Sequence, residues 1–134
     1  MKGSSLPCVF SPTWGNMRRS AAGRRFHRLI RTSPPTKGDF VPQGQRPGYW
    51  IRAAIDQALL EAIMHGVSVF DTERAARAQN DVFEARPFGS PFRVIATLDI
   101  PDDSAIEFDD AFGNEHHWDL YGTPAELLCM RDTT

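Results

Sequence analysis

The chain has 134 residues, a formal net charge of −2, 41% hydrophobic residues and 24% charged residues. This length and composition fit one globular domain of ordinary size and exclude a fibrous or wholly disordered chain. The most apolar stretch, Tyr49–Met64, is interrupted by three charged side chains, so we expect no membrane span.

The near-neutral net charge hides two oppositely charged parts. Residues 1–52 carry ten cations and one anion, Asp39, whereas the other 82 residues carry five cations and sixteen anions. Five of the ten cations lie within residues 1–25, which contain no acid. That segment offers too little apolar surface to offset the entropy of ordering. We therefore predict a disordered basic arm over residues 1–25 and a single acidic domain over residues 26–134.

The basic arm is a candidate for contacts with nucleic-acid phosphates. Its arginines have no interleaved aromatic residues, however, and the acidic domain would repel a duplex. We therefore do not expect nucleic-acid binding.

Two features bear on the compartment. The basic arm lacks the apolar run that a secretory signal requires after its charges. The two cysteines, Cys8 and Cys129, lie near opposite ends of the chain and form neither a disulfide framework nor a metal-ligand pair. Both observations are typical of a cytoplasmic protein with reduced thiols.

In chain order, the first expected elements are a strand, a loop and a helix. Residues 26–31 fit a short strand, and residues 32–48 hold seven prolines and glycines that predict an extended loop. Whether this loop is a mobile lid or a static wrap stays open. Tyr49–His65 repeats aliphatic side chains every four residues, which predicts an amphipathic helix that ends at Gly66.

The middle of the chain predicts a strand, a helix and a second strand. Val67–Phe70 has the composition of a short buried strand. Asp71 or Thr72 can accept backbone hydrogen bonds as the N-cap of a helix over Glu73–Asn80. Phe92–Ile100 alternates apolar and other side chains and predicts a strand with both faces partly covered.

The last third of the chain completes the expected fold. Ala105–Phe108 and His117–Tyr121 predict two short strands, the second at an edge of the sheet. Thr123–Glu126 combines a capping threonine, a proline and a glutamate in a capping-box pattern, which predicts a short C-terminal helix. We therefore expect an α+β fold, with a small mixed or antiparallel sheet and two or three helices.

Clustered histidines and acids make a metal site a hypothesis to test. His116 and His117 are adjacent, and neighbouring residues of a strand point to opposite faces, so they cannot easily share one ion. The acids of residues 102–110 lack the central glycine and the closing glutamate of an EF-hand. We expect a solvated acidic surface there and no metal site.

The motifs of common enzyme classes are not found in the sequence. It contains no glycine-rich phosphate loop and no nucleophile elbow. No serine or cysteine has a sequence context typical of a nucleophile. The motifs therefore name no reaction.

Four sequence blocks carry a resemblance. In order, they are Arg31–Phe40, Gly66–Ala75, Leu98–Pro101 and His117–Leu128. The series resembles a group of small uncharacterised bacterial proteins that share these blocks in the same order. The resemblance covers about residues 28–128 and implies one bacterial domain, but it implies no reaction.

The order of the elements is also similar to compact ADP-ribosyltransferase-like toxin domains. This resemblance implies an enzyme that uses NAD as its cofactor. It implies that His27 or Arg31 holds the dinucleotide and that Glu107 stabilises the ribose cation. It further implies that Phe70 or Tyr49 lies near the nicotinamide.

The other functional hypothesis, and the one that we favour from sequence, is a non-enzymatic protein of toxin–antitoxin or regulatory type. Such a protein would bind a protein partner and would need no cofactor. Trp118 and Tyr121 are the candidate anchors of its binding face, because aromatic side chains anchor interfaces. Packing of the same two side chains under the last helix is the alternative.

Overall fold

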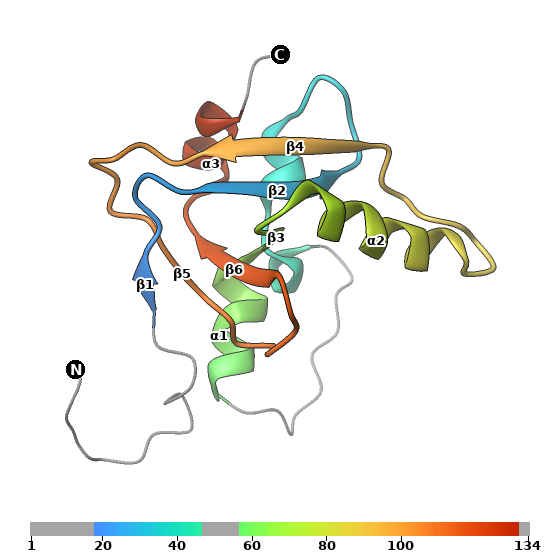
Figure 1. Cartoon of the computed structure of the whole chain (residues 1–134), viewed down its shortest axis with the longest axis horizontal. Helices are drawn as coiled ribbons and strands as arrows, with labels where there is room; N and C mark the ends of the chain where they lie inside the picture. The colour runs from blue at the N-terminus through green and yellow to red at the C-terminus, as the bar shows by residue number, and fades with distance from the viewer. Residues whose placement is uncertain (1–17, 47–56, 132–134) are drawn as a thin grey trace.

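The computed structural model describes residues 18–46 and 57–131 (Figure 1). Within these residues, six strands form one open antiparallel sheet in the order β1-β5-β6-β3-β2-β4, which confirms the predicted α+β fold. The strands are β1 (Arg19–Ser20), β2 (Arg25–Ile30), β3 (Val67–Phe70), β4 (Val94–Asp99), β5 (Glu107–Asp109) and β6 (His117–Tyr121). The helices are α1 (Gln57–His65), α2 (Glu73–Glu84) and α3 (Pro124–Met130), with short 3-10 helices η2 (Lys37–Phe40) and η3 (Gln43–Gln45). None of the helices in this described part is long and apolar enough to cross a membrane.

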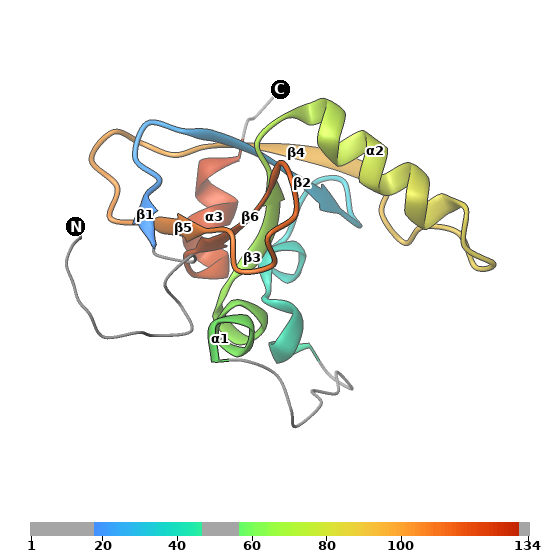
Figure 2. The same cartoon turned by 60° about the horizontal axis from the view of Figure 1, so that its bottom comes forward.

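The sheet is covered on both faces (Figure 2). On one face, α3 and η2 contribute Leu127 and Phe40 to the main apolar cluster, which also contains Phe26 of β2. On the other face, Ala76 of α2 packs against a smaller cluster that contains Leu29 of β2. Since neighbouring residues of a strand point to opposite faces, β2 supplies both clusters.

The helix caps follow the local sequence. Thr72 caps α2, and its side chain accepts a hydrogen bond from the backbone N–H of Ala75 at 3.1 Å. At α3, Thr123 and Glu126 each accept a hydrogen bond from the other's backbone N–H, at 3.2 and 2.9 Å. Both predicted helices are confirmed, and α2 runs on to Glu84.

The position of β6 in the sheet corrects one expectation. Its bounds, His117–Tyr121, agree with the predicted strand. It does not lie at an edge, however, because β5 and β3 flank it on either side. Beyond β5 the sheet continues into β1, a strand that the sequence pattern did not predict.

The basic arm also differs from the expectation in its described part, residues 18–25. Ala21 is fully buried in the main apolar cluster, and its backbone N–H donates to Ile106 at 2.9 Å. The guanidinium of Arg24 lies 4.8 Å from the centre of the Phe108 ring. Backbone pairing and cation–π contacts thus order these residues, and the domain begins before residue 26.

The proline- and glycine-rich segment is packed against the domain where it is described. Phe40 of η2 is fully buried, and the side-chain amide of Gln45 donates to the backbone carbonyl of Met64 in α1. A Cβ atom on Gly44 would lie only 2.6 Å from the sulfur of Met64, so the segment touches α1 closely. Residues 47–56, including Tyr49 and the first part of the predicted helix, lie outside the described residues.

Candidate functional site

A pocket lies where β2 and β3 separate. β2 pairs with β4 at six positions, but it pairs with β3 at one position only, His27 opposite Phe70. Beyond this pair, residues of both strands line a pocket of about 700 Å³ together with residues of η3, α1, α2 and β6. A cavity of this volume is large enough for a small organic molecule.

Arg28 of β2 fills the gap between the two strands. It is only 8% exposed; its Nε donates to the carbonyl of Asp39 at 2.7 Å and its Nη1 to the carbonyl of Ser68 at 2.6 Å. Burial, and the nearby charge of Arg46, lower the pKa of Arg28 to about 10, so the side chain stays charged at neutral pH. Arg28 therefore places a buried cation in the wall of the pocket.

Arg31, Arg46 and Arg86 line the same pocket, and the first two act on the charge of Arg28. Arg31 follows β2 and lies 5.7 Å from the centre of the Phe92 ring, and Arg46 follows η3 and donates to the carbonyl of Gly38 at 3.0 Å. Burial lowers the pKa of Arg46, and the charge of Arg31 lowers it further. The guanidinium groups are thus close enough to repel one another.

Asp39 is the acid that faces this group of arginines, but its oxygens are already engaged. They accept hydrogen bonds from the backbone N–H groups of Arg31 and Thr36, both at 2.9 Å, and from the hydroxyl of Thr32. Burial alone would raise the pKa of Asp39, but these hydrogen bonds outweigh burial and lower the pKa. In the described part of the chain, no carboxylate forms an ion pair with Arg28, Arg31 or Arg46.

A second wall of the pocket comes from β3 and β6. Ser68 is exposed, and its hydroxyl is hydrogen-bonded to Nε2 of His117. The His117 ring lies between Phe70 and Phe112, with ring centres 5.5 and 5.6 Å away. Burial, helped by the charge of Arg28, lowers the pKa of His117, so the ring is neutral at pH 7.

Asp119 lies beside Ser68 in the register of β3 and β6 and is only 2% exposed. Its Oδ2 atom and the Nδ1 atom of His117 are buried and have no hydrogen-bond partner among the described residues. Burial, together with the charges of Asp109 and Asp110, raises the pKa of Asp119 to about 7. The pocket wall therefore combines a neutral imidazole with a carboxyl group that is about half protonated at neutral pH.

The structure brings two of the five residues implied by the transferase resemblance to this pocket, Arg31 and Phe70. His27 does not line it; the Nδ1 atom of His27 lies 3.3 Å from the hydroxyl of Thr97. Glu107 lies on β5, three strands from β2, or about 14 Å at the usual strand spacing. Tyr49 lies outside the described residues.

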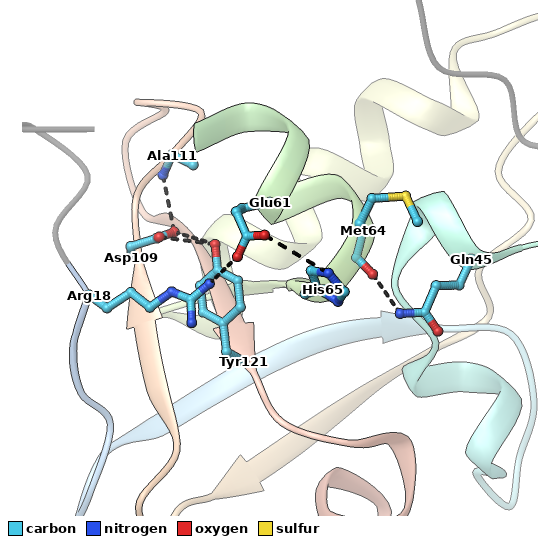
Figure 3. A network of polar contacts seen from close by, with 8 residues as sticks. All are labelled: Arg18, Gln45, Glu61, Met64, His65, Asp109, Ala111 and Tyr121. Atoms are coloured by element: carbon cyan, nitrogen blue, oxygen red, sulfur yellow. Dashed lines mark hydrogen bonds and ion pairs between the residues drawn. The ribbon is translucent and has the colours of Figure 1, made fainter. Parts of the chain in front are cut away.

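The two predicted partner-binding aromatics are half-buried, and their polar atoms are bonded within the chain. Nε1 of Trp118 donates to Asp71 at 3.1 Å. The hydroxyl of Tyr121 donates to Asp109 at 3.0 Å, and the guanidinium of Arg18 lies 3.7 Å from the centre of the Tyr121 ring (Figure 3). Neither ring stands exposed on an apolar patch, so partner binding through these residues stays a prediction.

Five residues that line the pocket were not predicted as site residues from the sequence: Arg28, Arg46, Ser68, His117 and Asp119. One signal was present. His117 and Asp119 stand two residues apart on a predicted strand, so they share a face. The partner strand β3, and hence Ser68, could not be assigned to that face without the register.

Comparisons with protein-family models, with curated proteins and with solved structures find no match to this chain. In the described residues, no group of three or more histidine, cysteine or acidic side chains could hold a metal ion.

Proposed function

We propose that this chain binds an anionic organic ligand about the size of a mononucleotide in the pocket between β2 and β3. The observation that supports this most directly is the convergence of Arg28, Arg31 and Arg46 on one pocket without a carboxylate ion pair in the described residues. We infer that the ligand supplies the missing negative charge through phosphate or carboxylate groups.

The electrostatics of the pocket favour an anion. Burying a charged group is costly unless an opposite charge or good hydrogen bonds compensate for it. Arg28 is buried, and it, Arg31 and Arg46 repel one another, so an anion between them would relieve both costs. Guanidinium groups also match the geometry of phosphate and carboxylate oxygens, which they bind through two parallel hydrogen bonds.

The other lining residues favour an organic ligand over a bare ion. Phe70, Phe83, Phe92 and Phe112 all line the pocket, and Phe83 packs against Phe92 with ring centres 5.8 Å apart. Pockets for small molecules combine apolar and aromatic walls with a few polar groups that fix orientation. An aromatic base joined to a phosphate group satisfies both parts of this lining.

The same argument bears on the two sequence-based hypotheses. NAD carries phosphate groups and aromatic rings, so it belongs among the ligands to test. Because His27 and Glu107 lie on strands that are three places apart in the sheet, we propose binding and not ADP-ribosyl transfer. A protein partner held by Trp118 and Tyr121 is a second hypothesis, but both side chains already have partners within the chain.

The test is a thermal-shift and calorimetric titration with adenosine monophosphate, NAD, inorganic phosphate, citrate and uncharged adenosine. We expect the anionic probes to stabilise the protein, by about 2.7 kcal/mol at a concentration 100 times the dissociation constant. Arg46→Gln should weaken binding, whereas Arg77→Gln, which removes a cation of α2 outside the pocket, should not. Equal shifts with adenosine and adenosine monophosphate, or no shift with any anion, would contradict the proposal.

A further inference from the structure

We propose that Ser68 is a nucleophile that takes a phosphoryl group from a phosphate monoester bound in this pocket, with His117 as its general base. This inference rests on the proposed anion-binding function and assigns a reaction to the same site. It would make the chain a phosphoryl-transferring enzyme rather than a binding protein alone.

The first support is the pairing of the two side chains. Ser68 is exposed on β3, and its hydroxyl is hydrogen-bonded to Nε2 of His117 on the neighbouring strand β6. A serine hydroxyl is a weak nucleophile unless an adjacent base takes its proton. His117 is held between Phe70 and Phe112, which fixes the orientation of its ring toward Ser68.

The second support is the protonation state of the base. Burial and the charge of Arg28 lower the pKa of His117, so the neutral ring can accept a proton at pH 7. When Nδ1 of the neutral ring carries the hydrogen, Nε2 is the free acceptor that faces the Ser68 hydroxyl. The neutral ring with its hydrogen on Nδ1 is the form that the proposed general base requires.

The third support is the cation beside the nucleophile. Nη1 of Arg28 lies 2.6 Å from the backbone carbonyl oxygen of Ser68, so a fixed guanidinium stands next to the attacking residue. Arg31 and Arg46 line the same pocket. Fixed cations around a transferring phosphoryl group stabilise the negative charge on its oxygens.

These arginines favour a phosphate ester over a carboxylic ester. The reacting carbon of a carboxylic ester carries no net charge, whereas the reacting phosphorus of a phosphate monoester is surrounded by charged oxygens. Three guanidinium groups can bind the charged oxygens of a phosphate monoester, whereas a carboxylic ester has no charged oxygen for them to bind. Acylation of Ser68 in place of phosphorylation would therefore contradict the proposal.

The proposed reaction has two steps. The Oγ atom of Ser68 forms a bond to phosphorus while the bond between phosphorus and the ester oxygen breaks. The proton of the Ser68 hydroxyl moves to Nε2 of His117 and then to the departing ester oxygen, which leaves as an alcohol. Water then gives a proton to Nε2 of His117 and attacks the phosphorus of the phosphoserine. The bond between phosphorus and Oγ breaks, Nε2 returns the proton to Oγ, and inorganic phosphate leaves.

The experiment uses the full chain and two phosphoryl donors, p-nitrophenyl phosphate and acetyl phosphate. Reactions are stopped with acid, and the mass of the protein and of its peptides locates any added group. We expect one phosphoryl group on Ser68 in the wild type and none in Ser68→Ala. His117→Gln should slow labelling about 100-fold or more, since general-base catalysis contributes at least that factor. Ser20→Ala, which alters an exposed serine on β1, is the matched control and should label normally.

Each outcome separates this inference from the proposed function. Ser68→Ala should keep the circular-dichroism spectrum of the wild type, which shows that it is folded and that only the reaction is lost. A wild-type protein that binds this nucleotide but is never phosphorylated overturns the inference and leaves the proposed function standing. A wild-type protein that does not bind adenosine monophosphate overturns both the inference and the proposed function. Acetyl phosphate can donate either its acetyl or its phosphoryl group to a nucleophile, so an acetyl group on Ser68, or a phosphoryl group on another residue, also overturns the inference.

Discussion

Arginines from the same N-terminal stretch meet opposite surroundings in two regions of the molecule. Arg18 and Arg25 form ion pairs with carboxylates of α1 and β4, at 2.9 and 2.6 Å. Arg28, Arg31 and Arg46 line the pocket and form no carboxylate ion pair in the described residues. The positive charge of the first 52 residues therefore has two uses. One part holds the arm against the acidic domain, and the other makes a positive pocket.

The acids show the same contrast. Asp39 is buried, and its carboxylate accepts several hydrogen bonds, so its charged form is stabilised. Asp119 is as deeply buried, but its Oδ2 has no partner in the described residues and its pKa rises to about 7. Buried polar groups with a structural role usually have hydrogen-bond partners. A buried polar group in a pocket that lacks a partner therefore marks a candidate site.

The largest effect that we expect comes from Asp119→Asn. The pKa of this carboxyl rises from 3.8 in the unfolded chain to about 7 in the fold. The free energy of unfolding of the protein therefore falls as the pH rises between these values, by about 4 kcal/mol at most. The variant removes this loss. It should therefore be more stable than the wild type at about pH 8 and equally stable at about pH 3, as measured by urea unfolding.

Asp39→Asn is the control for this first prediction. Because the Asp39 carboxylate is stabilised by hydrogen bonds and its pKa is lowered, the variant should be less stable than the wild type at neutral pH. The difference should shrink on acidification. If both variants change stability in the same direction at about pH 8, the contrast between the two acids is wrong.

The second prediction concerns Arg28→Met, which keeps much of the length of the side chain but removes its donors. The carbonyls of Asp39 and Ser68 then lose their hydrogen bonds inside the protein, at a cost of about 1–3 kcal/mol each, less the relief of arginine repulsion. We expect a net loss of about 2 kcal/mol in urea unfolding. An unchanged midpoint would mean that Arg28 does not link η2 to β3.

How far the sequence predicts this fold depends on whether the signal is local. The capping box at Thr123 involves residues three apart, so the sequence predicts it correctly, and Thr72 is one of the two N-cap candidates for α2. The bounds of β6 also agree with the predicted strand. By contrast, β1 has two residues and depends on its pairing with β5, which lies more than eighty positions away. No local pattern contains that information.

The pocket was not predictable for the same reason. It exists because β2 leaves β3 after a single paired position, a property of the register and not of composition. Ser68 and His117 lie 49 positions apart and meet only through the pairing of β3 with β6. Arg31 and Phe70 entered as candidates from a resemblance, and they do lie in one pocket. Without the register, the sequence could not connect them with Asp119.

The third prediction measures the arm contact through the pair Arg18 and Glu61 (Figure 3). A double-mutant cycle with Arg18→Gln and Glu61→Gln should give a coupling of about 0.2–1 kcal/mol, because both side chains are more than a third exposed. Arg18 also stacks on Tyr121, so Arg18→Gln alone should cost more than Glu61→Gln. High salt should reduce the coupling. A coupling that persists in high salt would mean that the contact is not electrostatic.

The smallest effect on stability should come from Arg46→Gln. This variant tests most directly whether the arginines of the pocket differ from the ion-paired arginines of the arm. Removing Arg18 deletes an attraction, whereas removing Arg46 deletes a repulsion from Arg28 and Arg31 and one hydrogen bond to Gly38. These opposing terms are each about 1 kcal/mol or less at a partly exposed site, so the ligand-free variant should be as stable as the wild type. Added adenosine monophosphate should then raise the melting temperature of the wild type more than that of Arg46→Gln. A clear loss of stability without ligand would place Arg46 among the structural arginines, alongside Arg18, and would remove it from the proposed site.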